Sequence, residues 1–221
     1  MQVILEALTG SRLHKLHSPS SDFDWKKVKI SPLVEVLSPF RTQNANHINE
    51  ETGETVVYEL QHFAKLAAKC NPTVLEMLWS NPMTDHTGDW LVKNRALFLH
   101  KEYIYFAHRG YAKSQWSLIK SPGASIRQAK AVIANIRILT QGISLLQTGT
   151  FTPVVPEDKR EPLLKIKLNP SILDTELNTY LDWIHRLEKD LEDAYSNCNI
   201  QFNQDISQIE KFLETAYIAR R

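Results

Sequence analysis

The first third of the chain alternates short apolar runs with polar turns, a pattern that predicts strands and short helices. Residues 3–8 form an apolar run typical of a buried strand, and residues 24–30 alternate like a half-buried strand. Between them, residues 11–16 predict a short helix followed by a turn. Residues 54–58 (ETVVY) predict a third strand, and the polar stretch 43–53 before it predicts a loop.

Apolar residues at helical spacing begin at about residue 59. The next helix is expected at Pro72, because proline suits a first helical position, where its missing N–H is not needed. Four apolar residues fall on one face of the earlier helix: Leu60, Phe63, Leu66 and Ala67.

From residue 89 onward the pattern is mainly helical. Residues 127–146 predict one long helix, and two amphipathic helices are expected around residues 177–191 and 206–216. The segment 151–162, rich in proline and charge, predicts a linker. We therefore expect an α+β fold, in which a small sheet with its helices precedes a helical C-terminal part.

The domain boundary is placed at residue 88. This gives an α/β core over residues 1–88 and a helical region over residues 89–221. With 221 residues and 43% hydrophobic content, the chain can bury a core of that size.

Composition and charge exclude several classes of protein. The formal net charge of +1 argues neither for nor against a nucleic-acid partner. Cys70 and Cys198 are far apart, which indicates a reducing compartment and no disulfide framework. No signal peptide or membrane-spanning run is visible, so we expect a soluble cytoplasmic protein with no membrane partner. The histidines show no zinc-ligand spacing, and no serine or cysteine nucleophile pattern is present.

The stretch 10–24, GSRLHKLHSPSSDFD, carries the clearest candidate chemistry. Asp22 and Asp24 stand one residue apart, so on a strand both side chains would point the same way. Paired acids are costly unless a cation lies between them, and magnesium is the usual partner of carboxylate oxygens. Gly10 and Ser11 form a small turn whose backbone N–H groups can meet a phosphate. The motif predicts a metal–triphosphate site, the alternative being simple capped turns without a ligand.

Four sequence blocks resemble a known group in content and in order. They are GSRLHKLHSPSSDFD, YELQHFAKLAAKCNPTVLEMLW, NRALFLHK and KAVIANIRILTQGISLLQTG, within residues 3–149. This series resembles nucleotidyltransferases of the DNA polymerase beta superfamily, and more narrowly a predicted bacterial and phage family of RNA-repair-pathway, polymerase-beta-like enzymes. The resemblance implies a small mixed nucleotidyltransferase sheet with helices and an activity of the EC 2.7.7 type.

The chain departs from the family pattern at three places. Lys15 stands where the family has a glycine, and Ala134 stands where it has a helix histidine. Lys26 and Lys27 occupy a segment that usually carries a glycine. The carboxylates and the Gly-Ser pair are intact, so the resemblance implies preserved chemistry but not a particular substrate.

The resemblance also implies roles for the motif residues. Asp22 and Asp24 would hold two magnesium ions, or manganese in their place, which bridge the triphosphate and activate an acceptor hydroxyl. Gly10 and Ser11 would contact the phosphates of a nucleoside triphosphate such as ATP. Pyrophosphate would leave without a covalent enzyme intermediate.

A third carboxylate is expected from a neighbouring strand, because two metal ions usually need one more anionic ligand. Glu54 is favoured as a catalytic and metal-binding residue, since the family often has an acid four residues before the tyrosine that is Tyr58 here. Glu59 and Glu51 remain alternatives for this role.

Three basic residues complete the predicted substrate site. Arg12 follows the Gly-Ser pair and could hold a phosphate in forked geometry. Lys130 and Arg137 are seven residues apart, on one face of the predicted long helix, and could neutralise a triphosphate or a nucleic-acid backbone. Solvated surface residues are the alternative interpretation for all three.

The sequence thus predicts a metal-dependent enzyme that transfers a nucleoside monophosphate from a triphosphate to an acceptor hydroxyl. RNA or tRNA ends are one candidate acceptor, and a protein acceptor is another. A nucleotide-binding or regulatory protein without turnover is the alternative from a different class. The oligomeric state is left open.

Overall fold

The computed structural model describes residues 2–40, 45–50, 53–121 and 123–219. The chain divides into two compact units. The first comprises Met1–His14, Ser18–His100 and Phe202–Arg221, and the second comprises Lys15–His17 and Lys101–Gln201. The C-terminal helix therefore belongs with the N-terminal part of the chain. The domain boundary expected at residue 88 stays a prediction.

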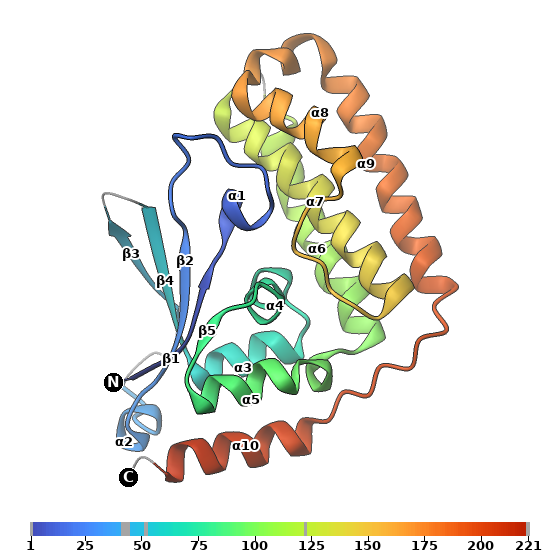
Figure 1. Ribbon diagram of the computed structural model, residues 1–221. Helices are drawn as coiled ribbons and strands as arrows, with labels where there is room; N and C mark the ends of the chain where they lie inside the picture. The colour runs from blue at the N-terminus through green and yellow to red at the C-terminus, as the bar shows by residue number, and fades with distance from the viewer. Residues whose placement is uncertain (1, 41–44, 51–52, 122, 220–221) are drawn as a thin grey trace. The chain divides into compact units, whose positions relative to one another are not determined.

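A five-stranded mixed sheet forms the centre of the first unit, in the order β3-β4-β2-β1-β5 (Figure 1). β1 (Gln2–Leu8) pairs antiparallel with β2 (Trp25–Ile30) and with the short β5 (Met83–Thr84). β2 runs parallel to β4 (Gly53–Glu59), and β3 (Asn46–Glu50) is antiparallel to β4. The α+β class expected from the sequence is confirmed.

The expected loop over residues 43–53 is wrong in part, because residues 46–50 form strand β3. This strand lies at the edge of the sheet, and the described side chains of Asn46, His47 and Ile48 are exposed. When both faces of an edge strand are exposed to solvent, its residues need not alternate between apolar and polar. The sequence of such a strand therefore resembles that of a loop. Backbone pairing with β4 forms the strand instead.

Helices surround this sheet in the first unit. Asn71 caps α4 by accepting a hydrogen bond from the Thr73 N–H, and Pro72 takes the first helical position as predicted. The helices are α1 (Gly10–Leu13), α2 (Leu33–Val36), α3 (Leu60–Ala68), α4 (Pro72–Trp79), α5 (His86–Lys93), the 3-10 turn η1 (Arg95–Phe98) and α10 (Ile206–Ile218).

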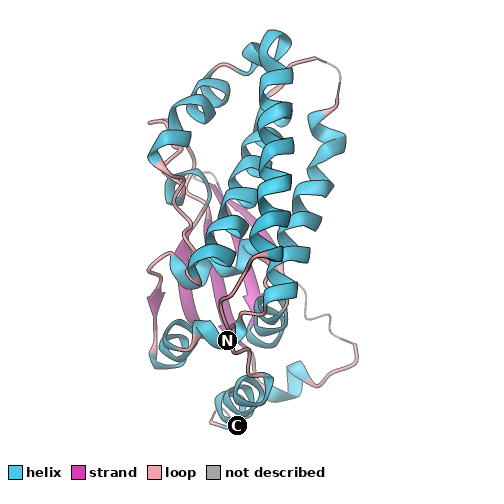
Figure 2. Cartoon of the chain, turned by 90° about the vertical axis from the view of Figure 1, so that its right-hand side faces the viewer, coloured by secondary structure: helices cyan, strands magenta, loops and turns pink. Residues whose placement is uncertain are grey.

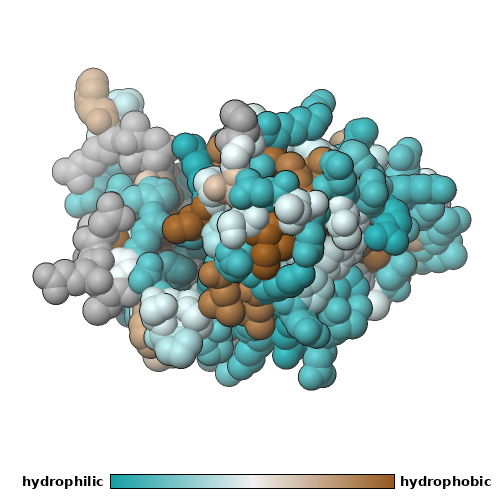
Figure 3. All heavy atoms as spheres, turned by 90° about the horizontal axis from the view of Figure 1, so that it is seen from above, coloured by the Kyte–Doolittle hydropathy of each residue, from teal (hydrophilic) through white to brown (hydrophobic). Residues whose placement is uncertain are grey.

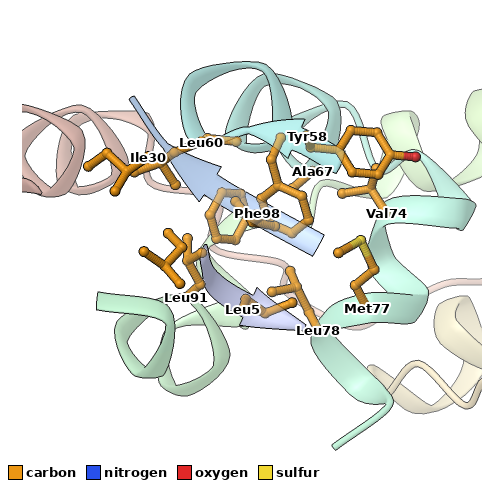
Figure 4. Packing of buried hydrophobic residues seen from close by; sticks show 14 of the residues in the cluster. Leu5, Ile30, Tyr58, Leu60, Ala67, Val74, Met77, Leu78, Leu91 and Phe98 are labelled. Atoms are coloured by element: carbon orange, nitrogen blue, oxygen red, sulfur yellow. The ribbon is translucent and has the colours of Figure 1, made fainter. Parts of the chain in front are cut away.

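The core of the first unit lies between the sheet and helices α3, α4 and α5 (Figure 4). Leu5 from β1 and Phe63 from α3 are fully buried, and Phe98 from η1 lies among them. Met77 and Leu78 close the cluster from α4. Burial of large apolar side chains is the main favourable contribution to this fold.

A buried carboxylate connects the C-terminal helix to the sheet. Glu59, at the end of β4, is 1% exposed and accepts hydrogen bonds from the Ser31 N–H at 3.2 Å and the Ser31 hydroxyl at 2.7 Å. The Tyr217 hydroxyl on α10 donates to the same carboxylate at 2.7 Å. Burial and this hydrogen bond raise the pKa of Tyr217, so the hydroxyl keeps its proton.

The second unit is a helical layer (Figure 2). It contains α6 (Lys101–Ile119), α7 (Ile126–Thr148), α8 (Glu157–Leu168), the turn η2 (Pro170–Ile172) and α9 (Leu173–Ser196). The stacked rings of Tyr105 and Tyr195, 4.4 Å apart, join α6 to α9.

The linker expected over residues 151–162 is shorter than predicted, because α8 begins at Glu157. Glu157 and Asp158 in the first turn favour a helix start after Pro156, since acidic groups stabilise a helix N-terminus. Pro162 lies inside this helix, where the sequence pattern suggested a break.

Helix α7 is the core helix of the second unit. Its length and composition alone would suffice to cross a membrane, but 67% of its most apolar window is buried inside the structure. Helices α6 and α9 contact it.

The face shown in Figure 3 is mainly hydrophilic, with a group of hydrophobic residues near its centre. The cytoplasmic location stays a prediction.

We expect Tyr217→Phe to lower the free energy of unfolding of the first unit by about 1–3 kcal/mol, because Glu59 loses a donor while buried. Urea denaturation followed by circular dichroism measures this change. The control is Tyr111→Phe on α6, which also removes one hydroxyl and should change stability by less than about 0.5 kcal/mol. Equal effects of the two variants would contradict a structural role for the Tyr217 hydroxyl.

Candidate functional site

The connection from β1 to β2 carries the predicted site. After β1 the chain forms α1, contributes Lys15–His17 to the second unit, and returns to β2. Asp22 and Asp24 lie in the loop before Trp25 rather than in the strand. The rule that side chains two residues apart on a strand point the same way therefore does not fix the directions of these two side chains. Asp22 is exposed and Asp24 is half-buried.

Gly10 and Asp24 approach each other closely. Gly10 has a φ of +63°, and a Cβ on it would lie 2.0 Å from Asp24 Oδ2. The neighbouring Thr9 N–H donates to the Asp24 carbonyl at 2.8 Å, and the Thr9 hydroxyl donates to it at 3.1 Å. The motif glycine thus allows the turn and makes room for the carboxylate.

Arg12 holds the acidic loop. Its Nε donates to the Asp22 carbonyl at 3.2 Å and its Nη2 donates to the Ser21 carbonyl at 2.7 Å. The guanidinium also lies 3.7 Å from the centroid of the Phe23 ring, in cation–π geometry. The structure therefore gives Arg12 a positioning role on this loop, and its predicted phosphate contact stays a prediction.

The parallel pairing of β2 with β4 brings Asp24 and Glu54 to the same end of adjacent strands. Trp25 lies opposite Thr55, so Asp24 and Glu54 each stand one residue before this pair. Gly53 is equally close to the loop, because a Cβ on it would lie 2.1 Å from the Phe23 carbonyl oxygen.

The Glu54 carboxylate contacts a neighbour on the edge strand. It forms an ion pair and hydrogen bond with His47 Nδ1, and both side chains are well exposed. Among the described residues, no group of three or more His, Cys, Asp or Glu side chains is placed to hold a metal ion. The carboxylate donors suit magnesium in kind, but the three side chains are not gathered around one point.

Lys26 and Tyr58 extend the same face of the sheet. Lys26 Nζ donates to the Thr73 carbonyl at the start of α4, at 3.2 Å. The pKa of Tyr58 is raised mainly by burial and further by the charges of Glu54 and Glu76, while a hydrogen bond with Thr73 opposes the rise. A neutral tyrosine hydroxyl and a lysine therefore lie beside the predicted carboxylates.

A buried ion pair supports the connection from the side of α4. His14, which ends α1, lies with its Nε2 3.7 Å from Glu76 Oε1, and both side chains are buried. Such a pair costs desolvation, but removing one partner would leave a buried charge. No local sequence pattern pairs His14 with Glu76, because the two residues are far apart along the chain.

Glu54 and Glu59, two of the candidates for the third carboxylate, lie in different surroundings. Glu59 stands five residues after Glu54, on the opposite face of β4, where Ser31 and Tyr217 surround it. Its hydrogen bonds identify it as a structural acid. Glu51 lies outside the described residues.

The two basic residues predicted on the long helix both lie on α7 in the second unit. Lys130 is exposed, whereas Arg137 is buried and donates from Nη1 to the Gln141 side chain at 3.3 Å. The two side chains thus lie on the same helix but differ in their exposure to solvent. Their binding of triphosphate stays a prediction.

Three residues of the site were missed by the sequence reasoning. Gly53 and His47 belong to the stretch interpreted as a loop, and Lys26 was noted only as a departure from the family pattern. The single glycine directly before a strand was the available signal for a close backbone approach. No local pattern reveals that His47 meets Glu54, because the contact depends on the pairing of β3 with β4.

Comparison with known proteins identifies the family to which the sequence is similar. A sequence model of the RNA repair pathway DNA polymerase beta family matches residues 1–214. The chain is also 25% identical over 169 residues to an uncharacterized 38.9 kDa protein of the nrdC-mobD intergenic region of Enterobacteria phage T4. That match covers 68% of this chain and 49% of the phage protein, so the chain spans about half the length of that relative.

Lys15 occupies the backbone conformation that explains the glycine of the family pattern. Its φ is +61°, which is unfavourable for a residue with a Cβ. We expect Lys15→Gly to raise the free energy of unfolding by about 0.5–1 kcal/mol, because glycine adopts a positive φ without steric strain. The gain is smaller than the strain removed, because glycine also has more conformational freedom in the unfolded chain. Thermal denaturation tests this, with Lys15→Ala as the control that keeps the Cβ. If both variants gained the same stability, the lysine side chain rather than its φ would be responsible.

Proposed function

Because the chain belongs to the RNA repair pathway DNA polymerase beta family, we propose that it transfers a nucleoside monophosphate from a nucleoside triphosphate to a hydroxyl at an RNA end. The family is one of polymerase-beta-like nucleotidyltransferases, which typically use divalent metals. The RNA acceptor, the metal and the release of pyrophosphate are the proposed parts. The match covers only 49% of the T4 relative, so other segments could take part in the whole activity.

The observation that supports this proposal most directly is the common end of β2 and β4. Asp24 and Glu54 stand at corresponding positions of two parallel neighbouring strands, and Asp22 is held next to them by Arg12. Gly10 adjoins Asp24 at the start of α1. Carboxylates from separate chain segments thus stand at one end of the sheet, beside the turn at Gly10, which supports a phosphate-transfer site there.

The residues would divide the reaction between them. A divalent cation held by Asp22 and Asp24 would neutralise phosphate charge and make the acceptor hydroxyl a better nucleophile. The acceptor oxygen forms a bond to the α-phosphorus, the bond to the β-phosphate oxygen breaks, and pyrophosphate leaves. Glu54 would join the acidic pair after release from His47, because its carboxylate is exposed and its contact with His47 lies at the surface.

Positioning falls to the residues around the carboxylates. Thr9 fixes the Asp24 backbone with two hydrogen bonds, and Arg12 fixes the backbone of Asp22. Lys26, anchored on α4, places positive charge on the face where the triphosphate would arrive. These residues would position the carboxylates and the positive charge before substrate binds. Much of the rate enhancement in phosphoryl transfer comes from such positioning.

We expect the double variant Asp22→Asn, Asp24→Asn to lose transfer of label from α-labelled triphosphates to RNA by at least about a hundredfold. Asparagine keeps the side-chain size and removes the charge that would hold the cation. The assay supplies each triphosphate in turn, with magnesium or manganese and pooled RNA or protein acceptors. Asp182→Asn on the exposed side of α9 is the control and should retain full transfer.

Transfer that survives in the double variant would overturn the proposed mechanism. Label that moves to protein rather than RNA would identify a protein acceptor. A wild-type chain that binds triphosphate without any transfer would favour the regulatory alternative.

A second experiment distinguishes Glu54 from Glu59. We expect Glu54→Gln to lower transfer at least about tenfold at nearly unchanged stability, because the side chain is exposed. Glu59→Gln should lower the free energy of unfolding by about 1–3 kcal/mol, because it disturbs the contacts with Ser31 and Tyr217. Transfer rates at a temperature where both variants are folded, with melting curves, separate the two effects. Full activity of Glu54→Gln would remove it from the site.

A further inference from the structure

One side of α6 in the second unit packs on α7, and the other side is exposed to solvent. Ile104, His108 and Ala112 are buried on the packed side. The Ala112 carbonyl accepts a hydrogen bond from Asn135 of α7 at 2.9 Å, and a Cβ on Gly142 of α7 would lie 2.9 Å from His108 Cγ. The exposed residues of α6 therefore lie away from its contacts with α7.

The exposed residues of α6 follow helical spacing and form one continuous stripe. They are Tyr103, Phe106, Arg109, Gly110 and Lys113, which together are called the α6 stripe below. Steps of three and four residues place them on one face, over about 15 Å of helix length. Tyr103 is 46% exposed and Phe106 is 57% exposed. Two neighbouring rings thus offer flat apolar surface to a ligand.

The charged residues of the α6 stripe are both cations. Arg109 and Lys113 form no ion pair with a carboxylate of the described chain, and the guanidinium of Arg109 lies 5.8 Å from the centroid of the Tyr105 ring. Glu102 precedes the stripe, and Glu188 of α9 accepts a hydrogen bond from an indole N–H of α6 at 3.0 Å. A second copy of the chain would bring the same cations face to face, so the stripe favours an anionic partner.

Gly110 lies in the middle of α6, where its own chain gives it no packing role. Glycine destabilises a helix interior relative to alanine. A Cβ on Gly142 would collide with His108, which explains that glycine, whereas a Cβ on Gly110 would meet no atom of the described chain within 4 Å. The missing side chain leaves room for a ligand to approach the helix backbone between Phe106 and Lys113.

A single strand of nucleic acid matches this combination of rings, cations and open backbone. Its bases stack on exposed aromatic side chains, and its phosphates lie beside arginine and lysine. The strand carries a flat base and a negative charge at every nucleotide, as the stripe carries rings next to cations. A duplex would offer the phosphates but keep its bases stacked inside.

We propose that the α6 stripe binds single-stranded nucleic acid. Bases stack on Tyr103 and Phe106, phosphates lie at Arg109 and Lys113, and the strand passes over Gly110. That this strand is the RNA acceptor rests on the proposed function, whereas the binding surface rests on α6 alone.

Fluorescence anisotropy of the full chain with a short labelled oligouridine tests the proposal, in buffer with a metal chelator. We expect binding without divalent metal, and a logarithm of the binding constant that falls by about 0.7 per phosphate contact for each tenfold rise in salt. Inorganic polyphosphate lacks bases and should compete at least about tenfold more weakly at equal phosphate concentration. Oligothymidine forms the second arm. A preference for oligouridine would identify an RNA strand, and equal binding would support a site that does not distinguish the sugars.

Two aromatic variants test the stacking. Tyr103→Ala and Phe106→Ala should each weaken oligouridine binding at least about fivefold, because each removes one ring on which a base stacks. Both side chains are exposed and alanine favours a helix, so folding should be preserved. Phe40→Ala is the matched control, because Phe40 is 95% exposed and belongs to the first unit.

Two charge variants test the phosphate contacts. Arg109→Gln and Lys113→Gln should each weaken binding severalfold and reduce the salt dependence by about 0.7 in slope. Arg127→Gln is the control, because Arg127 is an exposed cation of α7 outside the stripe. It should leave both the affinity and the slope unchanged.

Gly110→Leu separates binding from folding. Leucine favours a helix, so the melting temperature should rise by about 2–4 °C. The added side chain fills the approach to the backbone, so oligouridine binding should weaken at least about fivefold. Asn178→Leu, at an exposed position of α9, is the control for an added apolar side chain and should leave binding unchanged.

Three outcomes would overturn the proposal. They are absence of oligouridine binding, equal competition by polyphosphate, and unchanged binding in Tyr103→Ala and Phe106→Ala. A dimer of the unmodified chain in size-exclusion chromatography that Phe106→Ala dissociates would assign the stripe to a second copy instead.

The double variant Asp22→Asn, Asp24→Asn separates this surface from the proposed reaction. It should bind oligouridine like the unmodified chain, because the acidic residues belong to the first unit. Retained transfer in this variant, with RNA binding that still depends on the α6 stripe, would refute only the proposed function. Lost transfer in it, with unchanged RNA binding in the stripe variants, would refute only the α6 surface.

Discussion

The close approach of Gly10 to Asp24 is the constraint on which the candidate site depends. A residue with a Cβ at position 10 would collide with the carboxylate, and the turn itself needs a positive φ. Two hydrogen bonds from Thr9 hold the Asp24 carbonyl at the same place, where β1 ends and β2 begins. Because β2 pairs in parallel with β4, Asp24 and Glu54 each stand one residue before the paired Trp25 and Thr55. The turn at Gly10 therefore lies at the same end of the sheet as Glu54.

The acidic residues at this end are kept apart by backbone and basic partners. Arg12 binds the carbonyl of Asp22 rather than its carboxylate, and His47 occupies the carboxylate of Glu54. Like charges brought to one point would raise the energy of the folded chain. The exposed contact of Glu54 with His47 places a basic partner on one of these carboxylates. The separation of the carboxylates is thus compatible with a site that assembles around its metal.

Much of the fold follows from local patterns, but its pairings do not. The apolar runs before Gly10 and around residues 54–58 predicted strands correctly, since their side chains enter a core. Strand β3 was missed because its described side chains stay in water, and backbone pairing leaves no local signature. Asp22 and Asp24, which the spacing predicted to share one direction on a strand, precede β2 rather than lie in it. The partners of Arg12 and Glu54 could not be found from spacing, because they depend on how a loop folds back and which strands meet.

Two buried polar groups show how the contacts of a residue explain its position. Glu59 is enclosed by a backbone amide and two hydroxyls that donate to it, so its position is explained by the contacts that join α10 to the sheet. Arg137 is buried as well, and its Nη1 donates to Gln141, whose Nε2 donates to the Pro153 carbonyl. These bonds join α7 to the segment before α8, so a charged side chain on a core helix serves the packing of the second unit.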